Sequence, residues 1–276
     1  MTQLEVDDRF EDVHRSGLFV HEINLGAPGA RVILVHGAPD RSKNFARVLD
    51  ELGLASPVTI YDRRGYGRSM DAGALGGGFT QHAEDLIDII DQQPAIVIGQ
   101  SAGGAIALQA SIMAPDKFLA LGVWEPPMVA HEWWGGRSEW HRTQAWVAYS
   151  DMERVGEDIN RSIIGNERWD SLTAETKDLL RSEGRAFWAD MESQTIPLFN
   201  PEQVTVPVIV GKGTVHSFEH LGVAHRRLSE RLSAPLWVGE GASHAAHVTH
   251  APIWADFTRE VIHLARSQSG VQVRWR

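Results

Sequence analysis

The chain of 276 residues contains no cysteine, which excludes a disulfide scaffold and any thiolate metal site. It also lacks a run of about 18 consecutive apolar residues, which a helix needs to cross a bilayer. Positive charge is scarce: 26 Lys and Arg against 36 Asp and Glu give a net charge of −10, which argues against a general nucleic-acid-binding protein. The segment Met1–Phe10 has no basic or apolar part typical of a secretory signal. We therefore expect a cytoplasmic protein whose partner is a small-molecule substrate rather than nucleic acid or a membrane.

Short apolar runs alternate with stretches of helical periodicity along most of the chain. The hydrophobic content of 43% is ample for a packed core and excludes a disordered chain. Apolar strands that are each followed by a helix are typical of an α/β fold, a mostly parallel, doubly wound sheet with helices on both faces. The pattern predicts strands at 32–35, 57–61, 95–98, 119–124, 206–210 and 235–238, and helices near 42–52, from a cap at Thr80, at 102–114, and near 218–232 and 253–265.

The alternation stops between Pro126 and Phe199. This stretch has helical patterns without a convincing strand, and it holds six of the ten tryptophans. We predict a core of residues 1–125 and 200–276 and a helical cap of residues 126–199 over the end of the sheet; extra helices on the flank of the sheet are the alternative. Large aromatic side chains often fill a core. In a cap above a site they would instead favour an apolar ligand, and we expect Trp133, Trp134 and Trp188 to contact the substrate.

A nucleophile motif lies at one predicted strand end. Gly99-Gln100-Ser101-Ala102-Gly103 matches G-x-S-x-G, follows an apolar run and precedes a helix of small residues. A sharp strand-to-helix turn exposes the serine hydroxyl, and only very small neighbours fit beside it. The pattern predicts Ser101 as the nucleophile and the Ala102 N–H, at the helix start, as a donor to a developing oxyanion. A tight turn with an incidental serine is the alternative.

A second oxyanion donor is expected from an earlier loop that follows a strand. The turn His36-Gly37-Ala38-Pro39 follows the predicted strand at 32–35. Gly37 lets the backbone approach closely, and Pro39 stiffens the exit of the turn. We therefore predict the Ala38 N–H as the second donor and expect His36 to brace the loop rather than to catalyse.

The serine needs a base that takes its proton. Thirteen histidines are available. His244 ends the sequence Gly241-Ala242-Ser243-His244 directly after the last predicted strand, which brings it to the same sheet edge as Ser101. We predict His244 as the base, and we expect structural roles for His247 and His250.

An acid should orient the imidazole, and it too should lie at a strand end. The usual place is the loop at 211–216, which contains no Asp or Glu; the first carboxylate after it is Glu219. Glu125 closes the apolar strand that ends at Trp124, where a glutamate is costly to bury without a partner. His244 could be that partner. We predict Glu125 as the acid, with Glu219 as the alternative.

The segments HGAP, DRRGYGRS, GQSAG, WEPP and GASH, in this order, resemble the α/β-hydrolase superfamily and extend over nearly the whole chain apart from the cap. The resemblance implies the α/β-hydrolase fold. The serine differs from the nucleophile of the haloalkane dehalogenases and epoxide hydrolases, which use an aspartate. Some of those dehalogenases, and the lactone-cleaving zearalenone hydrolases, are similar in taking their acid from the strand end that Glu125 occupies. Thr214 departs from the commonest pattern, which has an aspartate there.

Together these features predict a serine hydrolase that cleaves a carboxylic ester or lactone of a small, apolar substrate through an acyl-enzyme, with no cofactor and no metal. Two alternatives keep the fold. One is a cofactor-independent carbon–carbon bond hydrolase or dioxygenase, and the other is a non-catalytic ligand-binding protein. The exact substrate, and whether the chain forms a homo-oligomer, stay open.

Three further patterns are predicted to be structural. The glycine-rich segment 73–78 has no strand leading into it and no Gly-Lys-Ser/Thr after it, which indicates a surface loop rather than a phosphate site. The arginines of segment 63–69 are expected to brace a tight turn. His216, His220 and His225 lack carboxylates at the spacing of a hydrolytic metal site, which favours a surface helix.

Overall fold

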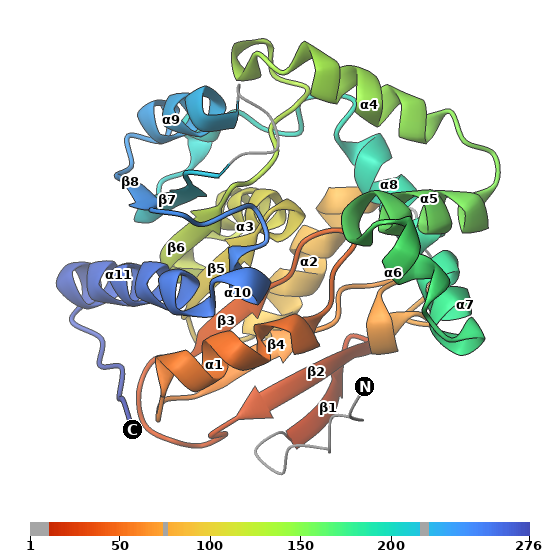
Figure 1. Cartoon of the computed structure of the whole chain (residues 1–276). Coiled ribbons are helices and arrows are strands. Elements are labelled where there is room, and N and C mark those ends of the chain that lie inside the picture. Colours follow the sequence, from red (N-terminus) through yellow and green to blue (C-terminus); the bar gives the residue numbers. More distant parts are fainter. Residues whose placement is uncertain (1–10, 74–76, 216–220) are drawn as a thin grey trace.

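The computed structural model describes residues 11–73, 77–215 and 221–276. Its strands form one sheet in the order β1-β2-β4-β3-β5-β6-β7-β8 (Figure 1). Neighbours from β4 to β8 run parallel, whereas β1 and β2 pair antiparallel. The strands are β1 (Glu11–Arg15), β2 (Leu18–Ile23), β3 (Val32–Val35), β4 (Val58–Tyr61), β5 (Ala95–Gln100), β6 (Phe118–Trp124), β7 (Val208–Gly213) and β8 (Leu236–Gly239). The predicted mostly parallel, doubly wound α/β fold is confirmed.

Helices cover both faces of the sheet, because the central parallel strands β3 to β7 are apolar and buried on both sides. One buried cluster joins the sheet to α2, α3 and α9, and the other joins it to α1 and α11. The helices are α1 (Ala46–Leu52), α2 (Gly78–Ile90), α3 (Ala102–Met113), α4 (Arg137–Val147), α5 (Met152–Ile164), α6 (Asn166–Asp170), α7 (Ala174–Ser182), α8 (Gly184–Ser193), α9 (Leu221–Arg231), α10 (Ala246–Thr249) and α11 (Ala251–Ser269).

Most predicted elements lie within a few residues of the observed ones, and the differences have local causes. Helix α2 begins at Gly78, and the predicted cap at Thr80 is wrong: the Thr80 hydroxyl accepts a hydrogen bond from Gln109 of α3 at 2.8 Å instead. The hairpin of β1 and β2 was not predicted. Its turn uses Ser16 and Gly17, both at positive φ, as two-residue hairpin turns require. Of segment 73–78, residues 74–76 lie outside the described ranges, as do His216, Glu219 and His220.

The chain leaves the sheet after β6 and returns at β7. Between them, the fully described stretch 126–199 forms α4 to α8 and no strand. These helices, green to cyan in Figure 1, gather at one side of the molecule, away from β1 and the C-terminal end of the chain. The division into core and cap remains a prediction. No helix within the described ranges is long and apolar enough to cross a membrane.

Candidate active site

Ser101 occupies a strained turn between β5 and α3. Its backbone has φ 51° and ψ −124°, a combination that L-residues rarely adopt. The turn is held at the sheet edge, because the Ser101 N–H donates to Trp124 O at 2.8 Å. A Cβ atom on Gly103 would lie 2.4 Å from Val35 O, and one on Gly99 would lie 2.4 Å from Gly103 O. The flanking glycines are therefore needed for strand, turn and helix to meet this closely.

The structure brings Glu125 and His244 together. His244 Nδ1 lies 2.9 Å from Glu125 Oε2, although the two residues are 119 positions apart in the chain. The other carboxylate oxygen, Oε1, accepts a hydrogen bond from Gly213 N–H at 2.9 Å. The Glu125 side chain is fully buried, whereas the His244 side chain is 45% exposed. A buried carboxylate thus fixes the ring of a histidine that water can reach.

The charge of Glu125 follows from these contacts. Burial alone would raise the pKa of its carboxyl group, but the hydrogen bond and charge of His244, together with the Gly213 N–H, bring the pKa below its usual value. Glu125 is therefore ionised at neutral pH and accepts the Nδ1 proton of His244. That leaves the Nε2 atom of His244 with a free lone pair, which is the form a general base needs.

Two residues to which the sequence analysis assigned no role position the His244 loop. Gln100, directly before Ser101, donates through Nε2 to His244 O at 3.2 Å. Thr214 accepts a hydrogen bond from Gly241 N–H at 2.8 Å through its hydroxyl. The residue at the usual position of the acid therefore braces the turn that leads to His244. No local pattern signals either contact, because the partners belong to different strand ends.

The predicted oxyanion loop lies against the serine. A Cβ atom on Gly37 would lie 3.1 Å from the Ser101 Cβ and 2.1 Å from Gln100 Oε1, so a larger residue would displace the Gln100 side chain. His36 is buried, and its Nε2 accepts from Arg63 N–H at 2.8 Å. Burial, and then the positive charge of Arg63, lower the pKa of His36 to about 4, which keeps the ring neutral. These are the contacts of a bracing residue. Ala38 and Ala102 directly follow Gly37 and Ser101, and their role as donors remains a prediction.

The other histidines have separate surroundings. His247 is buried and lies 2.9 Å from Asp40, which links the stretch after β8 to the oxyanion loop. His250 faces the Thr249 hydroxyl at 2.9 Å. The predicted surface position is wrong for His225, which is buried and packs its ring edge-on against Trp134. In the described part of the chain, no group of three His, Asp or Glu side chains could hold a metal ion.

The three tryptophans that were predicted to contact substrate pack against other parts of the protein. Trp134 is buried, and the Arg231 guanidinium lies over the ring of Trp133, 4.9 Å from its centroid. Trp188 of α8 donates through Nε1 to Val147 O at 3.2 Å, at the end of α4. The role of Trp133, Trp134 and Trp188 in substrate binding therefore stays a prediction.

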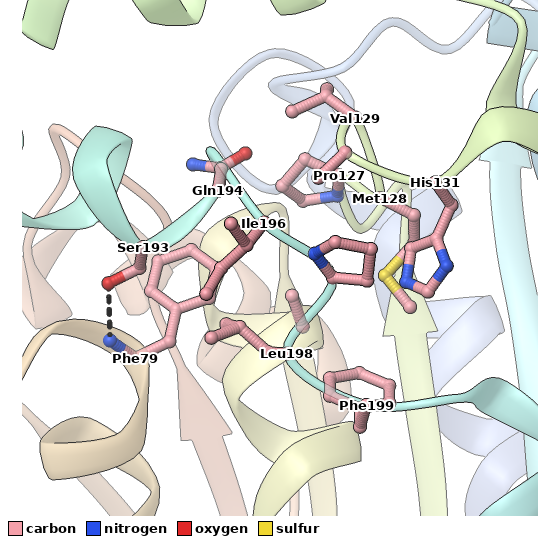
Figure 2. Close-up of a pocket in the computed structure, with 13 residues that line it drawn as sticks. Phe79, Pro127, Met128, Val129, His131, Ser193, Gln194, Ile196, Leu198 and Phe199 are labelled. Atoms are coloured by element: carbon pink, nitrogen blue, oxygen red, sulfur yellow. Dashed lines mark hydrogen bonds between the residues drawn. The ribbon is translucent and has the colours of Figure 1, made fainter.

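An apolar pocket opens beside α3, between the chain that leaves β6 and the chain that follows α8. Figure 2 shows aliphatic, aromatic and proline side chains turned toward it, with only a few polar groups. Ala105 forms part of its wall, and it lies one helical turn after Ser101 on α3. The pocket formed by the described residues is lined by Phe79, Ala105, Pro127, Met128, Val129, Ala130, His131, Ser193, Gln194, Ile196, Pro197, Leu198 and Phe199.

A strained serine after the central parallel strand, and a carboxylate–histidine pair at the ends of later strands, define an α/β hydrolase. The family described as "Serine aminopeptidase, S33" matches residues 26–215, and the chain belongs to this family of the α/β-hydrolase superfamily.

Several known proteins are similar to the chain. An epoxide hydrolase of Caballeronia sordidicola is 34% identical over 116 residues, which are 40% of this chain and 35% of that protein. A pimeloyl-[acyl-carrier protein] methyl ester esterase of Edwardsiella ictaluri is 28% identical over 189 residues, 66% of each protein. The matches thus span between about a third and two thirds of these relatives. The enol-lactonase of Burkholderia xenovorans LB400 has the same fold, with a TM-score of 0.70 at 15% identity over 92% of this chain and 100% of that one.

Proposed function

We propose that the protein is a serine hydrolase that cleaves a carboxylic ester or a lactone of a small, apolar substrate through an acyl-enzyme. The observation that carries the proposal is the 2.9 Å contact between Glu125 and His244, beside the turn that bears Ser101. The contact of Gln100 with His244 O supports it, because it ties the base loop to the residue next to the nucleophile. The esterase and lactonase among the similar proteins support the reaction class.

In the first half of the reaction, Ser101 Oγ forms a bond to the substrate carbonyl carbon as its proton moves to His244 Nε2. The carbonyl π electrons move to the oxygen, which the Ala38 and Ala102 N–H groups stabilise. The carbon–oxygen ester bond then breaks, and the leaving alkoxide takes the proton from His244. In a lactone the alcohol stays attached to the acyl group.

In the second half, water adds to the acyl carbon and gives a proton to His244. The tetrahedral intermediate collapses, Ser101 Oγ takes back the proton, and the carboxylic acid leaves. Glu125 keeps its charge throughout and stabilises the imidazolium that forms twice. The pocket next to Ala105 supports an apolar acyl group, because nearly all of its lining is hydrocarbon.

A panel of aryl esters, aliphatic esters and lactones tests the proposal on wild type, Ser101→Ala and a control, Ser267→Ala, which changes an exposed serine of α11. We expect hydrolysis of apolar esters or lactones, a fall in kcat of about 10⁴-fold or more in Ser101→Ala, and no change in the control. A fluorophosphonate probe should label wild type and not Ser101→Ala.

Three results would contradict the proposal. Retention of more than a tenth of the activity in Ser101→Ala would discard the nucleophile. A preference for short polar esters would remove the apolar substrate class. Oxygen uptake without added metal, in place of hydrolysis, would favour the dioxygenase alternative.

A further inference from the structure

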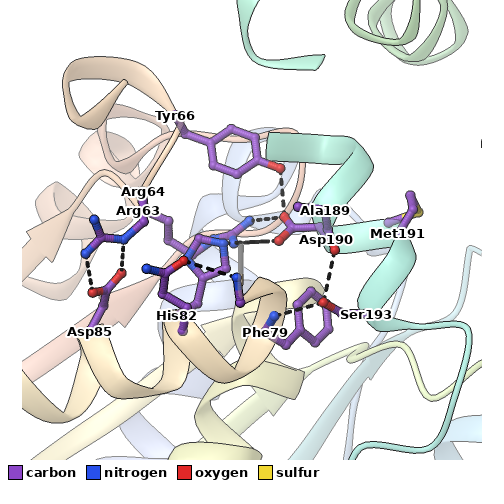
Figure 3. A network of polar contacts seen from close by, with 12 residues as sticks. Arg63, Arg64, Tyr66, Phe79, His82, Asp85, Ala189, Asp190, Met191 and Ser193 are labelled. Atoms are coloured by element: carbon purple, nitrogen blue, oxygen red, sulfur yellow. Dashed lines mark hydrogen bonds and ion pairs between the residues drawn. The ribbon is translucent and has the colours of Figure 1, made fainter. Parts of the chain in front are cut away.

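Helix α8 and its N-cap residue, Glu183, carry two buried carboxylates on one side. Asp190 lies seven residues after Glu183, close to two helical turns, so both side chains face the same way. Asp190 accepts hydrogen bonds from Tyr66 Oη at 2.7 Å and Arg63 Nη2 at 2.9 Å, and His82 Nε2 lies 3.2 Å from its other oxygen. Figure 3 shows these side chains converging on Asp190 from the turn after β4 and from α2. Asp190 thus joins α8 to the turn after β4 and to α2 through buried polar contacts.

The guanidinium that holds Asp190 also holds the oxyanion loop. Arg63 Nε donates to His36 O at 3.1 Å, and Nη2 donates to Gly37 O at 2.7 Å. The side chains of Arg63 and Asp190 are both fully buried. One arginine thus connects the cap helix with two successive carbonyl groups of the loop that lies against Ser101.

Glu183, the second carboxylate, also binds an arginine next to the oxyanion loop. Glu183 accepts from Arg41 Nε at 2.8 Å, and it also accepts from Gly67 N–H at 2.9 Å. Arg41 follows the loop residues Pro39 and Asp40 directly. The carboxylates of Glu183 and Asp190 therefore contact both ends of the segment 36–41, one through the partly buried Arg41 and the other through the fully buried Arg63.

The peptide group between Gly37 and Ala38 links these contacts to the reaction, because its N–H, that of Ala38, is the predicted oxyanion donor. In a planar trans peptide the C=O and the following N–H point in opposite directions. Gly37 O accepts hydrogen bonds from Arg63 Nη2 at 2.7 Å and from His36 Nδ1 at 2.9 Å, so Arg63, which also holds His36, helps to determine the direction of the Ala38 N–H. We propose that Asp190 is a positioning residue of the oxyanion hole: through Arg63, it holds the Gly37–Ala38 peptide plane with the Ala38 N–H toward the reacting carbonyl. This inference rests on the proposed function.

The charge of Asp190 is needed for this role. An unpaired guanidinium without water is strongly unfavourable, and its neighbours would rearrange to solvate it. Burial would raise the pKa of Asp190, but Arg63 and His82 hold it well below the usual range. Burial would likewise lower the pKa of Arg63, and Asp190 raises it above the usual value. Both groups are therefore charged at all pH values at which an esterase would be assayed.

Asp190→Asn tests the role, because it removes the charge and keeps the size of the side chain. The matched control is Asp85→Asn, which breaks the neighbouring ion pair of Arg64 at 2.6 Å but does not reach the loop at 36–37. Loss of one oxyanion donor typically costs about 10²–10³ in kcat. For a misaligned donor we expect kcat to fall about 10–100-fold in Asp190→Asn, with KM within about twofold of wild type. Affinity for a trifluoromethyl ketone, whose adduct carries the oxyanion, should fall by a similar factor.

Rates are divided by the concentration of sites that a fluorophosphonate labels, so a loss of folded protein does not count as a loss of kcat. A purely structural role predicts unchanged kcat per site and unchanged ketone affinity in Asp190→Asn, as in Asp85→Asn, and that result overturns the inference. If Asp190→Asn does not fold, Tyr66→Phe removes one donor to Asp190; an unchanged ketone affinity there overturns it as well. A wild-type protein that hydrolyses no ester and takes no label overturns the proposed function, and this inference with it.

Discussion

At the scale of single residues, the candidate site depends on how a buried carboxylate is satisfied. Glu125 has φ 43°, an uncommon backbone conformation for a glutamate. Both of its oxygens are used, one by His244 and one by the Gly213 N–H. Strand β7 thus contributes a backbone donor to the acid instead of a carboxylate of its own. This explains how the acid can come from β6 while Thr214 occupies the usual position.

Glu125→Gln should lower kcat by about 10²–10⁴-fold, because an uncharged amide neither fixes the imidazole tautomer nor stabilises the imidazolium. The competing candidate gives the comparison: Glu219→Gln should stay within about twofold of wild type. Ester hydrolysis by both variants, measured per folded protein, decides between the two acids. Equal losses, or a larger loss in Glu219→Gln, would remove Glu125 from the mechanism.

At the scale of elements, the start of α3 has to fit under the β3 loop. Gly103 and Gly104 are neighbours in the same helix, yet their surroundings differ. A Cβ on Gly103 would lie 2.4 Å from Val35 O and 2.5 Å from His36 O, which are backbone atoms. A Cβ on Gly104 would come no closer than 3.1 Å to Gly99 O and to the Pro126 Cβ. Close backbone packing therefore requires glycine at position 103. At position 104 the space is tight, but a Cβ atom can be accommodated by a small shift.

Gly103→Ala should destabilise the protein by about 1–3 kcal/mol, the usual cost of forcing an extra carbon into a packed site. Gly104→Ala should cost less, since alanine also gains up to about 1 kcal/mol in helix propensity. Urea unfolding measures both, and ester hydrolysis should fall further in Gly103→Ala, which displaces the carbonyls of residues 35 and 36. Equal stability of the two variants would contradict this account of the turn.

At the scale of the whole molecule, buried polar contacts join segments that are far apart in the chain. Asp190 of α8 pairs with Arg63, which follows β4, and Asp40 pairs with His247, which follows β8. His36 lies where these segments meet, and Arg63 is hydrogen-bonded to its ring and its carbonyl. The segment 36–41 thus lies where helix α8, the turn after β4 and the stretch after β8 meet.

This arrangement predicts a loss of stability in mild acid. The pKa of His36 is about 4 in the folded state and about 6.5 when unfolded, so between these values only the unfolded state binds the proton. Stability from this group is complete above pH 6.5 and decreases as the pH falls to 4, by about 2–3 kcal/mol in all. Glutamine at position 36 cannot bind this proton. The free energy of unfolding of His36→Gln, measured with urea, should therefore approach that of wild type as the pH falls from 6.5 to 4.5. A constant difference between the two would contradict the prediction.

Much of the fold and part of the candidate site could be predicted from local patterns. Apolar runs of β-branched residues specify strands wherever both faces are buried, and G-x-S-x-G specifies the turn at Ser101 because only tiny neighbours fit there. The pairing of Glu125 with His244 could be proposed from a general rule, since a carboxylate at the end of a buried strand needs a partner. The β1–β2 hairpin was missed because the edge strand β1, Glu11–Arg15, has mostly charged and polar residues and no apolar run.

The sequence by itself determined the strands and helices of the parallel part of the sheet, the residue types at the strand ends and the glycines of the sharp turn, because these depend on neighbours a few positions away. Only the tertiary structure decided that Gln100 and Thr214 brace the His244 loop, that His225 is buried, and that Asp190 reaches Arg63 from 127 positions away. The physical reason is that a hydrogen bond or ion pair depends on distances of about 3 Å. Such distances between remote segments arise only when the helices and the sheet have packed together.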